Sequence, residues 1–181
     1  MRSINVYVSE LAFLSLTLSS VEAYKKECYG LLLGFRSDTQ WRVEYAVPYQ
    51  TAERGHTRVV PHGLRDRRVR TCVAHLSSFE QLGTYHSHPA WGNCRALAKP
   101  SAPDIESVAP GELEMIIAVN DARRPQRFHN SDHGRVLTGT VCDFSLTIAT
   151  FYKPPLGDQR LKRMPIRCPY ALGFQPDIVL K

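Results

Sequence analysis

The segment Cys28–Arg36, "CYGLLLGFR", places the strongest constraint on the fold of this chain. It is a short apolar run with flanking glycines, a pattern typical of a strand that is buried on both faces. The next residues, "SDTQ", favour a turn, and Trp41–Val47 then alternates between apolar and polar side chains. The two segments together predict a β-hairpin whose first strand is buried.

The remaining segments alternate between strand and helix patterns. Ser9 is the expected N-cap of a helix whose apolar residues recur at helical spacing through about Lys25. A second amphipathic helix is expected at residues 64–82, and a short one from Ser101. Further strands are expected at residues 4–8, 83–88, 114–121, 135–141 and 144–152. This order predicts an α/β fold, a single domain with a mixed, mostly antiparallel sheet flanked by helices.

The length and composition fit one globular domain. A chain of 181 residues with 43% hydrophobic residues can bury a substantial core. We expect residues 1–152 to form this domain, and the Pro-rich segment 153–181 to pack on its surface as a tail. Residues 50–61 have the pattern of a loop or a weak strand.

The basic residues do not form a nucleic-acid signature. The net charge of +6 is a mild excess. The helix expected at residues 64–82 has Leu64, Cys72 and Phe79 on its apolar side, and it also carries a cluster of arginines: Arg65, Arg67, Arg68 and Arg70. Because Asp66 interrupts this cluster, a solvated helix face is the favoured interpretation, and an acidic partner or nucleic acid is the alternative.

The cysteines and the apolar segments predict where the protein resides. The five cysteines are scattered and form no C-x-x-C pair, which favours a reducing compartment. No apolar run approaches the roughly 18 residues that a membrane span needs. Serines and Thr17 interrupt the apolar stretch 11–20, so we do not interpret it as a secretory signal. We therefore expect a cytoplasmic protein without a membrane partner.

Two histidines suggest a metal site. Side chains at positions i and i+2 of a strand point to the same face, so His86 and His88 can reach one ion. A catalytic zinc usually has three protein ligands and a water, and Asp104 is the first carboxylate after the histidines. Ser101-Ala-Pro-Asp104 also has the pattern of a plain helix capping box, so a purely structural interpretation stays open.

Glu27 is the second candidate for chemistry. It lies between the first helix and the buried strand, where an unpaired carboxylate would be costly. Either its side chain faces solvent at the end of the helix, or it is a general base beside a metal site.

Three motifs together resemble a known family. They follow one another in the order typical of the JAMM (MPN-plus) family of zinc metalloproteases: Glu27-x-x-Gly30-x-Leu32-x-Gly34, His86-Ser87-His88-Pro89 and Ser101-x-x-Asp104. The resemblance spans roughly residues 3–150 and implies the JAMM/MPN fold, which is similar to that of cytidine deaminases. It also implies that His86, His88 and Asp104 bind Zn²⁺. Glu27 would be the general base and then the acid, and the Ser101 hydroxyl would stabilise the oxyanion.

The resemblance also implies a class of substrate. The best-known members of the family remove ubiquitin or ubiquitin-like proteins from their conjugates. We therefore expect an isopeptidase or peptidase that acts after the C-terminal glycine of ubiquitin or a ubiquitin-like protein, with E1- or E2-like proteins as further partners. Processing of a sulfur-carrier precursor or another peptide, and a non-catalytic scaffold, are the alternatives. A cytidine-deaminase-like zinc site is disfavoured because a Pro-Cys-x-x-Cys ligand pair is absent.

One segment departs from the pattern of the family. Residues 89–100 separate His88 from Ser101, and the family usually has five fewer residues there. This insertion is either a harmless loop or a wall of the substrate groove, with Trp91 as an apolar contact. Cys94 is an alternative zinc ligand or a redox-sensitive group. The loop at residues 50–63 is the other candidate to line the groove.

Overall fold

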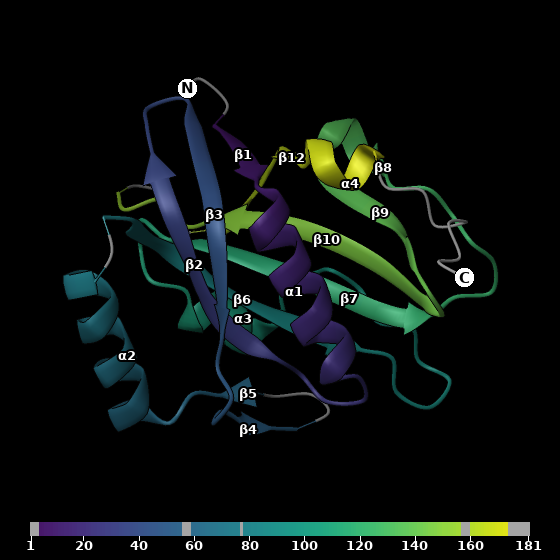
Figure 1. Cartoon of the computed structure of the whole chain (residues 1–181), viewed down its shortest axis with the longest axis horizontal. Helices are drawn as coiled ribbons and strands as arrows, with labels where there is room; N and C mark the ends of the chain where they lie inside the picture. Colours follow the sequence, from purple (N-terminus) through teal and green to yellow (C-terminus); the bar gives the residue numbers. More distant parts are fainter. Residues whose placement is uncertain (1–3, 56–58, 77, 157–159, 174–181) are drawn as a thin grey trace.

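The computed structural model describes residues 4–55, 59–76, 78–156 and 160–173 of the chain. The strands of its large sheet are β1 (Asn5–Val8), β2 (Tyr29–Arg36), β3 (Gln40–Pro48), β6 (Glu80–Pro89), β7 (Leu113–Asp121), β8 (His129–Ser131), β9 (Val136–Val141), β10 (Phe144–Tyr152), β11 (Lys162–Met164) and β12 (Ile166–Arg167). Within the described residues nine of these ten strands lie in the order β12-β1-β3-β2-β6-β7-β10-β9-β8, and the tenth, β11, pairs with β10 (Figure 1).

Four helices and a second, small sheet complete the fold of the described residues. The helices are α1 (Glu10–Glu22), α2 (Gly63–Leu76), α3 (Ala102–Ser107) and α4 (Pro169–Gly173), and a 3₁₀ turn, η1, covers Asp132–Gly134. The small sheet is a two-stranded hairpin of β4 (Glu53–Arg54) and β5 (Val59–Val60). It falls in the segment expected to be a loop or a weak strand, of which residues 56–58 lie outside the described part.

The large sheet is mixed. β1 runs parallel to β3 and to β12, and β6 runs parallel to β7. The other neighbouring strands are antiparallel. This arrangement confirms the expected α/β class and the mostly antiparallel sheet. The predicted hairpin is also confirmed, since β2 pairs with β3, and its residues Leu31, Leu32 and Leu33 are all buried.

The first helix begins where the sequence indicates and ends earlier than expected. The Ser9 side chain accepts a hydrogen bond from Ala12 N, so the predicted N-cap is present. The helix stops at Glu22 with Ala23 as its C-cap instead of continuing to about Lys25, which adopts a left-handed backbone conformation with φ of 78°. The resulting turn leads the chain directly to Glu27 and β2.

The second helix differs from the prediction in its length and in its buried side. It ends at Leu76, and the following strand begins at Glu80, three residues before the expected start. Leu64 is 74% exposed, and it is Val69 and Val73 that pack against the sheet. Phe79 belongs to the strand side, where its ring contacts two aromatic rings of the β2–β3 hairpin.

The chain after residue 153 enters the sheet. β11 and β12 extend the large sheet at two places, and α4 follows them. Ile166, Cys168 and Ala171 are buried in the main core. Such short pairings leave no periodic signal in the sequence, so the sequence predicts only a surface tail there. Residues 157–159 and 174–181 of the expected tail lie outside the described part.

The pleat of β6 separates the main core from the candidate site. Tyr85 is fully buried on the side of α1, where its hydroxyl lies 3.0 Å from Ser19 Oγ. His86, the next residue, therefore points to the opposite face, the side of α3. Figure 1 shows α1 crossing the near face of the sheet and α3 behind it.

The close approach of three strands at Gly30 gives a first prediction. A Cβ atom at Gly30 would collide with the carbonyl oxygen of Val47 and with the ring of Tyr85. We expect Gly30→Ala to lower the free energy of unfolding by about 1–3 kcal/mol, measured by chemical denaturation. Gly63→Ala is the control, because nothing lies within 4 Å of a Cβ at that position. Equal losses in both variants would contradict this steric explanation.

Candidate metal centre

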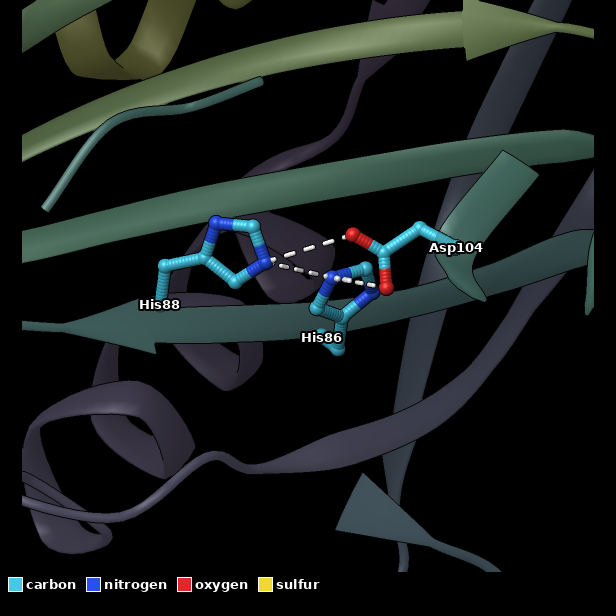
Figure 2. Close-up of side chains that lie close together, drawn as sticks. All are labelled: His86, His88 and Asp104. Atoms are coloured by element: carbon cyan, nitrogen blue, oxygen red, sulfur yellow. Dashed lines mark hydrogen bonds and ion pairs between the residues drawn. The ribbon is translucent and has the colours of Figure 1, made fainter. Parts of the chain in front are cut away.

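Three side chains from two elements meet on the α3 side of the sheet. His86 and His88 project from the same face of β6, and Asp104 comes from the first turn of α3 (Figure 2). His86 Nε2 lies 3.4 Å from Asp104 Oδ1, and His88 Nε2 lies 3.5 Å from Asp104 Oδ2. One ligand atom from each residue falls within 4.8 Å of the others, so the group could hold a metal ion. The structure thus brings together the three residues that the sequence suggested as ligands.

Both imidazole rings are oriented through Nδ1. His86 Nδ1 lies 2.5 Å from Glu114 Oε1, and His88 Nδ1 lies 2.9 Å from the carbonyl oxygen of Leu97. A carboxylate and a carbonyl can only accept, so each Nδ1 carries a hydrogen. The two Nε2 atoms are left to face Asp104, and they lie 2.9 Å apart. This arrangement of outer partners is the one that metal-binding histidines usually have.

Asp104 serves two purposes at once. Its Oδ2 atom accepts a hydrogen bond of 2.6 Å from Ser101 N, and its own N–H donates to Ser101 Oγ at 3.4 Å. The capping box that offered a purely structural interpretation is therefore present. Burial of the carboxyl group opposes its ionisation, but hydrogen bonds with His86 and His88 outweigh this effect and hold the pKa of Asp104 far below its usual range. The cap therefore presents an ionised carboxylate to the histidines.

Glu27 lines the same pocket as His86 and Asp104. Only 6% of the residue is exposed, and its backbone N–H donates to the carbonyl oxygen of Gly55 at 2.9 Å. Burial raises the pKa of Glu27, and the neighbouring charges of His86 and His88 partly offset that rise. The solvent-facing interpretation is therefore wrong. A buried carboxyl group with a raised pKa holds a proton more readily than an exposed one, which suits it to proton transfer.

The pocket has a volume of about 870 Å³ and extends beyond the metal group. Ser101 lies exposed at its rim, and Val59 and Val60 of β5 form part of its wall. Arg70 of α2 also lines the pocket. Its side chain is half-buried, and its Nε donates to Asp66 Oδ2 at 2.8 Å. The arginines at positions 65, 67 and 68 are exposed, as expected of a solvated helix face.

Sequence reasoning missed the residues that support the ligands. Glu114 is 3% exposed and also accepts a hydrogen bond from the Thr84 hydroxyl. The one signal was its position, a carboxylate within the otherwise apolar run of β7. Asn120 and the Leu97 carbonyl left no signal, because their roles depend on the parallel register of β6 and β7 and on the path of residues 89–100.

The insertion begins with its own turn. Trp91 and Cys94 exchange two backbone hydrogen bonds, of 3.1 and 2.8 Å, and both residues are exposed. Among the described residues, Cys94 belongs to no group of three or more side chains that could hold a metal ion. The geometry therefore favours Asp104 over Cys94 as the third ligand.

Fold and site together define a class. A histidine pair and an aspartate, held together on one face of a mixed α/β sheet, are a ligand set of the kind found in catalytic metal sites. The chain belongs to the Prok-JAB family, the prokaryotic homologs of the JAB domain, whose model matches residues 12–130. Members of this family are typically metallohydrolases of the JAMM type.

A solved structure supports the fold. The solution structure of a protein from Desulfitobacterium hafniense is similar over 90% of this chain and 92% of that chain, with a TM-score of 0.62 and 18% sequence identity. A search of curated proteins finds no match. Among the described residues, no helix has the length and apolar character that crossing a membrane would require.

The ligand assignment can be tested by metal content. We expect about one divalent ion per chain in the purified protein, and much less in Asp104→Ala, because two imidazoles alone leave the site incomplete. Cys94→Ser is the control and should retain the ion, since its thiol lies outside the group. Metal content would be measured by elemental analysis. Loss in Cys94→Ser together with retention in Asp104→Ala would reverse the assignment.

A second prediction concerns pH. Burial opposes protonation of His86, but its hydrogen bonds with Asp104 and Glu114 outweigh burial and raise its pKa to about 10 in the metal-free protein. A metal ion must displace this proton, so affinity falls as pH falls. We expect the affinity to keep rising from about pH 7 to about pH 9, by up to roughly tenfold per unit, measured by chelator competition.

Glu114→Gln provides the comparison for this pH dependence. The substitution removes a charge that holds the proton on His86, so the affinity should reach its plateau at a lower pH than in the parent protein. The same plateau in both proteins would contradict the role given to Glu114.

Proposed function

We propose that the protein is a zinc-dependent isopeptidase or peptidase that cleaves after the C-terminal glycine of ubiquitin or a ubiquitin-like protein. The observation that carries this proposal is that the buried Glu27 lines the same pocket as His86 and Asp104, two members of the candidate metal group. A metal group beside a buried carboxyl of raised pKa is suited to hydrolysis by an activated water.

The donor set supports zinc as the ion. His86, His88 and Asp104 supply two imidazole nitrogens and one carboxylate oxygen, and zinc readily accepts both types of ligand. Three protein ligands leave one position for water, as in catalytic zinc sites. A bound zinc ion lowers the pKa of water and polarises a carbonyl group.

Glu27 and Ser101 would then divide the remaining chemistry. Glu27 takes a proton from the attacking water and later passes it to the leaving amine, which its raised pKa favours. Ser101 Oγ accepts the N–H of Asp104, so its own hydrogen can still be donated to a developing oxyanion at the rim of the pocket. No covalent intermediate with the protein is needed. The adjacent Cys28 thiol is buried and contacts Ser20 Oγ at 3.4 Å, which fits a packing role.

A strand in the wall of the pocket supports an extended peptide as the substrate. Val59 and Val60 of β5 line the pocket, and within the described residues this strand pairs on one side, with β4, in the small sheet. A free strand edge can pair with an extended chain, and a Gly-Gly end has no side chains to hinder its approach to the metal group. We propose that ubiquitin or a ubiquitin-like protein and its conjugates bind there, and that E1- or E2-like proteins act in the same pathway. Processing of a sulfur-carrier precursor is the alternative substrate for the same chemistry.

Glu27→Gln tests the proposed chemistry. The amide cannot accept the proton, so we expect the rate of cleavage to fall by about 10²- to 10⁴-fold while zinc is retained. Two probes would be used, ubiquitin with a peptide fused after its C-terminal Gly-Gly and a sulfur-carrier protein with the same fusion. Glu106→Gln on the exposed side of α3 is the control and should leave the rate unchanged.

The outcomes separate the alternatives. Cleavage of the ubiquitin fusion that a chelator abolishes and zinc restores supports deconjugation. Cleavage of the sulfur-carrier fusion alone supports precursor processing. A protein that binds zinc but cleaves neither probe would favour a scaffold, and activity that survives Glu27→Gln would refute the role of Glu27.

A further inference from the structure

A main-chain group of the insertion orients one of the two histidines. The carbonyl oxygen of Leu97 accepts the Nδ1 hydrogen of His88, so the Nε2 atom of His88 is left to face Asp104. His86 is oriented differently, by the buried side chain of Glu114. The two ligands therefore depend on different supports, and the support of His88 lies in a segment without regular secondary structure.

The position of the Leu97 carbonyl depends on its neighbours. The Leu97 side chain is 57% exposed and cannot anchor the segment. Ala98 is buried in an apolar cluster that includes residues of β7 and β10. On the other side of Leu97, the Asn120 side chain bonds twice to Ala96: Ala96 N donates to Asn120 Oδ1 at 2.8 Å, and Asn120 Nδ2 donates to the Ala96 carbonyl oxygen at 3.2 Å.

Strand β7 carries both Glu114 and Asn120 on one face. Glu114 and Asn120 are six residues apart on β7, so their side chains project on the same side of the strand. In the parallel register Thr84 is opposite Glu114 and His88 is opposite Ala118. One end of this face thus supports His86 through Glu114, and the other end holds the segment that supports His88.

We propose that Asn120 is a positioning residue of the metal centre, which fixes residues 96–98 so that the Leu97 carbonyl orients His88. The inference rests on the proposed function, because it concerns the metal site of that function. It gives the insertion a role in supporting a ligand. Asparagine is suited to this role because its amide carries a donor and an acceptor, whereas aspartate lacks the donor that the Ala96 carbonyl needs.

The first test uses the metal-free protein labelled with ¹⁵N-histidine. A hydrogen-bonded Nδ1–H exchanges slowly with water and gives a separate NMR signal for each ring. We expect Asn120→Ala and Asn120→Asp to abolish the His88 signal and to leave the His86 signal, since Glu114 still holds that ring. The His86 signal therefore serves as an internal control.

Thr140→Val is the matched control variant. Thr140 Oγ1 makes the same two-bond contact with the backbone of Gln126, accepting from its N–H at 2.7 Å and donating to its carbonyl oxygen at 3.1 Å. It lies on β9, which β10 separates from β7 in the sheet. Its loss should lower the melting temperature and leave both histidine signals intact.

The second measurement is zinc affinity by chelator competition. Loss of an outer support typically weakens metal binding by about 10- to 100-fold, so we expect at least a tenfold loss in Asn120→Ala and none in Thr140→Val. An unchanged His88 signal and affinity in Asn120→Ala would overturn the proposal. So would equal effects in both variants, which would indicate general loosening.

The two proposals can fail separately. A parent protein that binds no zinc would refute the proposed function, and the His88 signal of the metal-free protein would still decide the role of Asn120. Tight zinc binding that is insensitive to Asn120→Ala would refute only the positioning role.

Discussion

The parallel pairing of β6 with β7 is the constraint on which the candidate site depends. Parallel strands cannot be joined by a tight turn, so the chain must return from the end of β6 to the start of β7 before it can pair. This connection covers residues 90–112 and contains the insertion and α3. Because it returns on the side of the histidines, it carries Asp104 back to them. The position of Asp104, the candidate third ligand, is therefore a consequence of the topology of the sheet.

Hydrogen bonds to neighbouring side chains and to a helix cap explain how charged groups are tolerated in this buried place. Glu27 and Glu114 are 6% and 3% exposed, and burial of unpaired carboxylates would be costly. Glu114 is satisfied by Thr84 and His86, and Asp104 by its cap and the histidines. The ionised carboxylate of Asp104 faces the Nε2 atoms of His86 and His88. A divalent cation between them would interact favourably with all three groups, which is a physical reason for the group to bind metal.

Much of the site could be predicted from local patterns. The i, i+2 spacing of His86 and His88 determines a common face on any strand, and a capping box determines where Asp104 lies on its helix. The buried side of α2 could not be predicted. Val69 and Val73 pack against the sheet there, in place of the apolar side that the spacing indicates. Glu114 and Asn120 act across strands, and the sequence does not encode the register of a parallel pair in a local pattern.

The insertion shows how a chain can gain residues between two ligands without displacing either. Closing a longer loop costs little free energy, but a free loop would leave the Leu97 carbonyl without a fixed position. Here the residues around Trp91 and Cys94 close on themselves through paired backbone hydrogen bonds, so the extra length is taken up before Ala96. From Ala96 onward the chain is held by Asn120, and it reaches Ser101 from a fixed point. The anchor at Ala96 thus lies between that turn and Asp104, so a change in the length of the turn need not move the candidate ligand.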